Sequence, residues 1–204
     1  MATLGLHRLV LVGMSLGGAV ALTYAARHPA DLLGLVLVDM GPGGSRPVGG
    51  CRLGAFMQGP DEFASLEEVV ERALAFNPRR SPDRLRRTLV RNLRQTAHGT
   101  WIWKYDRRFP ERAFDHSLPE EERRRLREER TRRLWEAARL VTCPALVVRG
   151  GESDMFLDED AKLTAAAFAN GRWVRIAGAS HTVQSDSPAA LAAALREFLG
   201  ALPV

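Results

Sequence analysis

A serine set between glycines is the first candidate for chemistry in this sequence, within the stretch Gly13-Met14-Ser15-Leu16-Gly17. A serine hydroxyl is a weak nucleophile unless a base removes its proton, and it must stand clear of the surrounding backbone. A sharp turn from a strand into a helix exposes it, and small flanking residues relieve the crowding. The turn also leaves the amide of Leu16 free at a helix N-terminus, where it can stabilise an oxyanion. The motif predicts a nucleophilic Ser15, with Gly13, Met14 and Gly17 completing the turn.

A nucleophilic serine needs a histidine that accepts its proton. Of the five histidines, only His181 lies in a loop just beyond a predicted strand and before a predicted helix. We therefore expect His181 to be the base. The alternative is a loop histidine that makes local hydrogen bonds only.

The carboxylate that orients this histidine has several candidates. Asp154 follows a predicted strand and precedes His181 by enough residues for one helix and one strand, so it is the preferred acid. Asp39 ends another predicted strand and is the main competitor, although the residues after it are more typical of the start of a loop. The remaining alternatives are Glu152, Asp158 and Asp160.

The elements that must position these residues alternate between strands and helices. Continuous apolar runs rich in valine and leucine are typical of strands that are covered on both faces. Such runs occupy 7–13 and 32–40, strand signals return at 144–151 and 172–178, and helices are expected at 16–28, 158–169 and 188–199. This alternation predicts an α/β fold with a parallel sheet flanked by helices. Ligands bind beyond the carboxyl ends of such strands, which is where every candidate catalytic residue falls.

An insertion interrupts this pattern after the second strand. It begins with a loop rich in glycine and proline at 41–50, and helical periodicity then continues to about 141. Helices are expected at 61–76, 81–95 and 119–140. We interpret 42–141 as a helical cap, inserted into a core formed by 1–41 and 142–204.

Three aromatic residues of the insertion occupy alternate positions, namely Trp101, Trp103 and Tyr105. A cap can roof a substrate pocket, so these side chains are candidates for lining it. The alternative is that they dock the cap on the core.

Composition excludes several other classes of function. The charge of +5 comes from 29 basic and 24 acidic residues, and the densest basic run, 120–133, interleaves both signs. Such a run is typical of a solvated helix face with ion pairs, and it argues against nucleic-acid binding.

No apolar run reaches the roughly 18 residues that a membrane span requires. Cys51 and Cys143 lack metal-ligand spacing, and no secretory leader precedes the first strand, so we expect a reduced, cytoplasmic setting and no membrane partner.

The chain resembles the alpha/beta-hydrolase family over nearly its whole length, in the branch of esterases, lipases and C–C hydrolases with a helical cap. The residues that carry the resemblance are Gly13, Ser15, Gly17, Asp154 and His181, in the order serine, acid, histidine. Many members have a histidine where Met14 stands, but that position tolerates variation. The resemblance implies a serine hydrolase that acts on an ester or related carbonyl bond of a small molecule, without a metal or organic cofactor.

One departure from the family concerns the segment before Ser15. Members of the family begin with several more strands and two helices, including a loop that donates the second oxyanion amide. We therefore expect this chain to be a fragment of a longer product; the alternatives are a partner chain that supplies the strands and a self-sufficient, rearranged hydrolase. The alternative function is that of a catalytically impaired fragment or an interaction subunit. An uncovered first strand would also expose backbone groups through which the chain could self-associate.

Overall fold

The structure, a computed structural model, describes residues 5–44, 53–78, 80–106 and 117–203. The chain forms two compact units: Met1–Gly49 with Glu121–Val204, and Gly50–Glu120. The second unit is shorter than the expected insertion of 42–141, because helix α6 (Glu120–Leu140) packs Leu134 and Ala138 into the core of the first unit. The boundaries expected from sequence are corrected accordingly.

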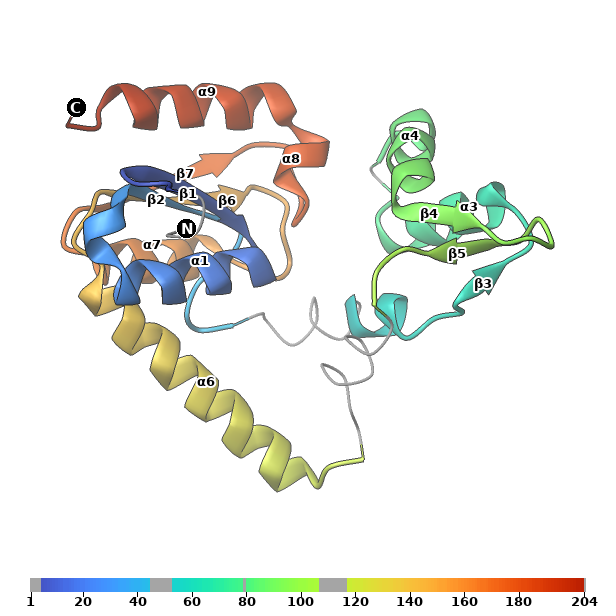
Figure 1. Ribbon diagram of the computed structural model, residues 1–204, viewed down its shortest axis with the longest axis horizontal. Helices are drawn as coiled ribbons and strands as arrows, with labels where there is room; N and C mark the ends of the chain where they lie inside the picture. Colours follow the sequence, from blue (N-terminus) through green and yellow to red (C-terminus); the bar gives the residue numbers. More distant parts are fainter. Residues whose placement is uncertain (1–4, 45–52, 79, 107–116, 204) are drawn as a thin grey trace. The chain divides into compact units, whose positions relative to one another are not determined.

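A four-stranded parallel sheet forms the centre of the first unit (Figure 1). Its strands, in spatial order, are β1 (Leu9–Met14), β2 (Leu32–Val38), β6 (Ala145–Gly150) and β7 (Gly171–Ile176). Every residue of β6 is buried, as is nearly all of β2. This burial on both faces explains the apolar runs Leu32–Val38 and Ala145–Val148, and it confirms the predicted α/β fold with a parallel sheet.

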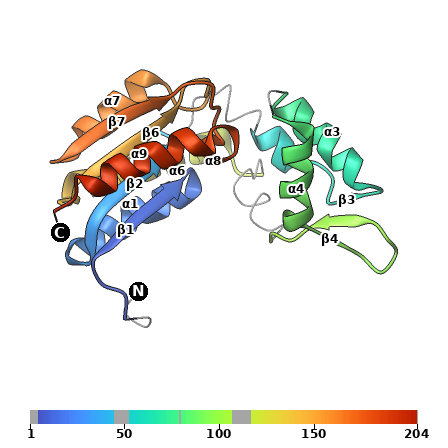
Figure 2. The same ribbon diagram turned by 90° about the horizontal axis from the view of Figure 1, so that it is seen from above.

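Helices cover both faces of this sheet, and Figure 2 shows α9 (Pro188–Gly200) lying along one of them. Alternate residues of β2 point to opposite sides: Leu35 and Leu37 pack in one apolar cluster, and Val36 and Val38 in another. The first cluster also contains residues of α1 (Leu16–Arg27), α6 and α7 (Asp158–Ala166). The second contains residues of α8 (Val183–Asp186) and α9. The sheet therefore holds the ends of its strands in a fixed frame.

Strand β1 lies at one edge of the sheet among the described strands. The side chain of Val12, in the middle of β1, is 52% exposed. An apolar edge strand is a template for pairing with another strand. Self-association through β1 stays a prediction.

The second unit combines α3 (Leu66–Phe76) and α4 (Pro82–Asn92) with a small antiparallel sheet that the sequence analysis did not predict. In spatial order its strands are β3 (Glu62–Phe63), β5 (Trp101–Trp103) and β4 (Leu93–Gln95). The expected helices at 61–76 and 81–95 are therefore too long at one end each. Ser65 caps α3 by accepting a hydrogen bond from the amide of Glu68 at 3.2 Å. Strands of two or three residues are too short to show alternating hydrophobicity, so periodicity could not reveal them.

The aromatic residues of the insertion pack within the second unit itself. The ring of Trp103 stands edge-on to Phe63, with centroids 5.9 Å apart, and lies 5.4 Å from the ring of Tyr105. Trp101 packs against the same apolar cluster, which includes the buried Leu85. These contacts give the aromatic residues a role in the core of this unit, and their role in lining a pocket stays a prediction.

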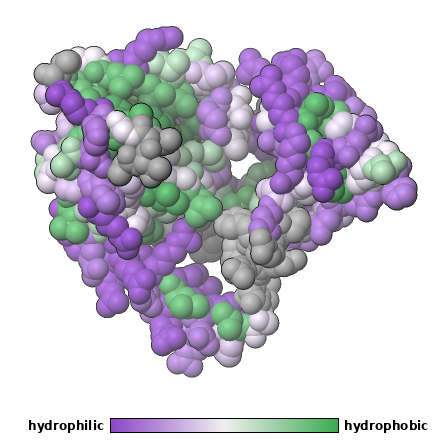
Figure 3. Space-filling view, viewed as in Figure 1, coloured by the Kyte–Doolittle hydropathy of each residue, from purple (hydrophilic) through white to green (hydrophobic). Residues whose placement is uncertain are grey.

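Helix α6 carries the arginine-rich run, and its surface in Figure 3 is mainly hydrophilic. Arg124 lies 3.9 Å from the carboxylate of Glu128, four residues later, and Arg133 pairs with Glu129. Such pairs are typical of a solvated helix face. None of the helices in the described part of the chain is both long and apolar enough to cross a membrane.

Candidate active site

Ser15 occupies a strained turn between β1 and α1. Its backbone has φ 50° and ψ −119°, a conformation that residues with a side chain rarely adopt. The Ser15 amide donates a hydrogen bond to the carbonyl of Val38 at 3.2 Å, and the Ser15 carbonyl accepts from the amide of Ala19 at 3.1 Å. The neighbouring strand and the following helix thus hold the bend that the sequence predicts. Leu16 is the first residue of α1, where a backbone amide has no acceptor within the helix.

The glycines around Ser15 differ in how much space surrounds them. A Cβ atom on Gly13 would lie 2.4 Å from the carbonyl oxygen of Gly17, whereas one on Gly17 would meet nothing within 4 Å. A Cβ atom on Gly18 would lie 3.0 Å from the carbonyl oxygen of Gly13. Gly13 is therefore crowded, as the motif predicts. The second crowded glycine is Gly18, whereas Gly17 has open space around it.

We expect alanine to be tolerated at Gly17 and not at Gly13. Gly13→Ala should lower the free energy of unfolding by about 1–3 kcal/mol, because the added methyl group meets rigid backbone atoms. Gly17→Ala should raise it by up to about 1 kcal/mol, because alanine favours the helix that begins there. Urea unfolding of the two variants beside the wild type measures both effects. A larger loss in Gly17→Ala than in Gly13→Ala would contradict this description of the turn.

His181 is paired with Asp39 in the structure, and not with Asp154. The Nδ1 atom of His181 lies 2.8 Å from the Oδ2 atom of Asp39. The Asp39 side chain is fully buried, and that of His181 is 13% exposed. This contact corrects the preference for Asp154, which lies half-buried in the loop after β6.

The register of the sheet explains how Asp39 reaches this place. Met14, the last residue of β1, pairs with Val38, the last residue of β2, so Ser15 and Asp39 follow neighbouring strands at the same level. Asp39 also has a positive φ of 49°, and its amide donates to the carbonyl of Val148 on β6 at 2.7 Å. The chain therefore bends at Asp39 as it does at Ser15.

Two further donors satisfy the buried carboxylate of Asp39. The amide of Gly150 donates to Oδ1 at 2.8 Å, and the hydroxyl of Ser153 donates to Oδ2 at 2.6 Å. Burial of an unpaired carboxylate is costly, and several hydrogen bonds offset that cost. Asp39 is thus an acceptor with three partners, one of which is the imidazole of His181.

The end of β6 and the loop after it supply these donors, Gly150 as the last residue of the strand and Ser153 in the loop, and the sequence analysis did not identify them. Arg149 is buried on β6, and its guanidinium donates to the carbonyls of Phe156 at 3.0 Å and of Ser153 at 3.2 Å. Gly150 has a second role, since a Cβ atom there would lie 2.2 Å from the carbonyl oxygen of Ser180. A residue without a side chain at 150 allows the segment that carries His181 to approach. The glycine pair at the end of β6, Gly150 and Gly151, is the sequence signal for this close approach.

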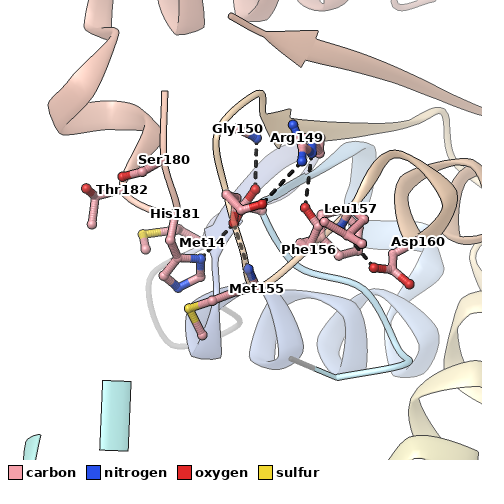
Figure 4. Close-up of polar contacts among 12 residues, drawn as sticks. Met14, Arg149, Gly150, Met155, Phe156, Leu157, Asp160, Ser180, His181 and Thr182 are labelled. Carbon is pink, nitrogen blue, oxygen red and sulfur yellow. Dashed lines mark hydrogen bonds and ion pairs between the residues drawn. The ribbon is translucent and has the colours of Figure 1, made fainter. Parts of the chain in front are cut away.

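The segment after β7 also contacts the turn at Ser15. The Nε2 atom of Gln184 donates to the sulfur of Met14 at 3.1 Å, and Figure 4 shows Met14 beside His181. Met14 precedes Ser15, and it packs against the apolar cluster that contains the buried Val183. The structure therefore brings the turn at Ser15, Asp39 and His181 together at the carboxyl ends of the strands of one sheet.

The described residues offer less support for a metal site or for a cysteine nucleophile. No group of three or more histidine, cysteine, aspartate or glutamate side chains among them is arranged to hold a metal ion. Cys143 is buried, and burial raises the pKa of its thiol, which makes it a poor nucleophile. Cys51 lies outside the described residues.

Comparison with known proteins identifies relatives over most of the chain. A family model described as the alpha/beta hydrolase family matches residues 1–194. The chain is 34% identical over 198 residues to the esterase Rv0045c of Mycobacterium tuberculosis (strain ATCC 25618 / H37Rv), an alignment that covers 93% of this chain and 60% of the esterase. It is 27% identical over 208 residues to the 3-hydroxybutyrate-oligomer hydrolase of Cupriavidus necator, with coverage of 98% and 68%. The chain thus spans about 60% of the length of the first of these relatives.

Solved structures of an esterase and of another hydrolase superpose on most of this chain. The crystal structure of esterase Rv0045c from Mycobacterium tuberculosis superposes with a TM-score of 0.70 at 29% identity, covering 97% of this chain and 62% of that one. The crystal structure of E-2-(acetamidomethylene)succinate hydrolase superposes with a TM-score of 0.79, covering 98% of this chain and 69% of that one. At 23% identity, the second likeness concerns the fold alone.

Proposed function

Because this chain belongs to the alpha/beta hydrolase family, we propose that it hydrolyses a carboxylic ester or related carbonyl bond of a small molecule, with Ser15 as the nucleophile. The observation that carries the proposal is the contact between the buried Asp39 and His181 at the strand ends where Ser15 makes its strained turn. Similarity to an esterase of Mycobacterium tuberculosis supports an ester as the substrate class.

The roles follow from which nitrogen of His181 is engaged. An ionised carboxylate only accepts hydrogen bonds, so the contact with Asp39 places a proton on Nδ1 and leaves Nε2 as a base. His181 Nε2 takes the proton of Ser15 as the serine oxygen bonds to the carbonyl carbon, and Asp39 stabilises the resulting imidazolium. The amide of Leu16 stabilises the charge on the carbonyl oxygen.

The second half of the cycle reuses the same groups. The imidazolium gives its proton to the leaving alcohol, and an acyl group remains on Ser15. His181 then takes a proton from water as the water oxygen attacks the acyl carbon. As the bond between the acyl carbon and the Ser15 oxygen breaks, the imidazolium gives this proton to the serine oxygen, and the acid is released. No metal or organic cofactor takes part in this proposal.

The proposal is tested by the hydrolysis of p-nitrophenyl acetate by the purified chain. We expect a rate that rises linearly with the concentration of folded chain, saturates with ester and disappears when the chain is unfolded in urea and diluted into the assay. A rate equal to that of buffer would overturn the proposal. A series of p-nitrophenyl esters of increasing acyl length then gives the substrate preference.

The second candidate function is that of a catalytically impaired hydrolase that lacks one oxyanion donor, or of an interaction subunit. Loss of one oxyanion donor lowers kcat by about 10²–10³-fold. Such a chain would still form the acyl-enzyme, but it would turn over slowly. A stoichiometric burst of p-nitrophenol followed by little steady-state hydrolysis distinguishes this function from that of a complete enzyme.

A further inference from the structure

The carboxylate of Asp186 holds both residues that flank His181. Asp186 Oδ2 accepts hydrogen bonds from the amide of Ser180, at 2.9 Å, and from the Ser180 hydroxyl. The hydroxyl of Thr182 lies 3.3 Å from each carboxylate oxygen of Asp186. Figure 4 shows Ser180 and Thr182 next to each other, on the same side of His181. One half-buried side chain thus joins the backbone before the imidazole to the residue after it.

His181 needs such support because no regular element contains it. It lies between β7 and α8, and the turn after β7 passes through Gly178 with a φ of 69°. Its imidazole must nevertheless keep Nδ1 at 2.8 Å from Asp39. A displacement of about 1 Å at a reacting group can lower a rate by about 10²-fold.

Asp186 is itself anchored to the core of the first unit. Its amide donates to the carbonyl of Thr182 at 3.0 Å, within the turn that forms α8. Val183 of the same turn is fully buried beneath the sheet face that α9 covers. The hydrogen bonds of Asp186 with Ser180 and Thr182 therefore connect the segment that carries His181 to a fixed part of the fold.

We propose that Asp186 is a positioning residue for the imidazole of His181. It acts through Ser180 and Thr182, and it has no role in proton transfer. This inference rests on the proposed function of Ser15, Asp39 and His181. If Asp186 only stabilised α8, its substitution would lower the melting temperature without changing the position of the His181 imidazole.

Two substitutions separate these roles. Asp186→Ala removes all the acceptors, and Asp186→Asn keeps one carbonyl oxygen for the Ser180 amide. We expect Asp186→Ala to lower kcat for p-nitrophenyl acetate by about 10- to 100-fold, with KM nearly unchanged. Asp186→Asn should recover most of the lost activity. Glu159→Ala, which removes an exposed carboxylate on α7, is the matched control and should behave as the wild type.

A second readout does not depend on activity. The Nδ1 proton of His181, shared with Asp39, should give a far-downfield signal in the proton NMR spectrum of the wild type and of Glu159→Ala. It should be shifted or lost in Asp186→Ala and present in Asp186→Asn. A wild type without esterase activity would overturn the proposed function, and this signal would still decide the role of Asp186.

Unchanged kcat and an unchanged signal in Asp186→Ala would overturn the inference, even if the melting temperature fell. Should Asp186→Ala fail to fold, Ser180→Ala and Thr182→Val each remove one donor to the same carboxylate. Wild-type kcat and an unchanged signal in both of these variants would equally overturn it.

Discussion

Replacing Ser15 with alanine is expected to lower kcat for an activated ester by about 10⁴- to 10⁶-fold. The serine oxygen forms the bond to the acyl group, and nothing else among the residues at this turn can take its place. The residual rate should reflect binding and oxyanion stabilisation alone. Steady-state hydrolysis of p-nitrophenyl acetate, followed at saturating ester, measures the loss.

Ser15→Gly is the matched control for the strain at this position. The positive φ of Ser15 costs about 1–3 kcal/mol in a residue with a side chain, and glycine relieves most of that cost. Ser15→Gly should therefore be as inactive as Ser15→Ala but more resistant to urea. Activity near the wild-type level in either variant would show that Ser15 is not the nucleophile.

Replacing Asp39 with asparagine is expected to lower kcat by about 10⁴-fold, whereas Asp154→Asn should retain most of the activity. An amide at position 39 can still accept the hydrogen bond from Gly150, but it is neutral and cannot stabilise the imidazolium. It can also donate to Nδ1, which would place the imidazole proton on Nε2 and remove the base. The two variants are compared in the same ester assay, with unfolding curves to show that each is folded.

The opposite order of effects would restore Asp154 as the acid. A large loss in Asp154→Asn together with a small loss in Asp39→Asn would mean that the loop after β6 rearranges when substrate binds. Equal losses would assign part of the role to each carboxylate.

The sheet was predictable because its central strands are buried on both faces. The runs at 32–40 and 144–151 are apolar for this reason, and β2 and β6 lie within them. The strand ends then indicated which polar residues could meet. Ser15 and His181 were predicted from their local context alone, a glycine-flanked turn and a loop between strand and helix.

The carboxylate that contacts His181 could not be predicted correctly from the sequence, because Asp39 and Asp154 both follow strands of the sheet. The choice depends on the bend at Asp39, with its positive φ, and on the donors that Gly150 and Ser153 supply. A single sequence does not indicate which non-glycine residue adopts a positive φ. Side chains that are distant in sequence cannot be placed by spacing alone.

The inserted unit was the least predictable part of the chain. Its strands are too short to show a period, and α6 buries little more than Leu134 and Ala138 among many charged residues. Such a helix carries too weak an apolar stripe to indicate which unit it joins. The end of the second unit at Glu120 could therefore be identified only from the packing of α6 in the structure.

The most direct test of the account is the covalent labelling of the chain by a fluorophosphonate, with the modified residue located and the labelling rate measured by mass spectrometry. The account predicts one label per chain, on Ser15, at a rate that Asp39→Asn lowers strongly and Asp154→Asn leaves nearly unchanged. A label on any other residue, or a rate on Ser15 that depends on Asp154 and not on Asp39, would contradict it.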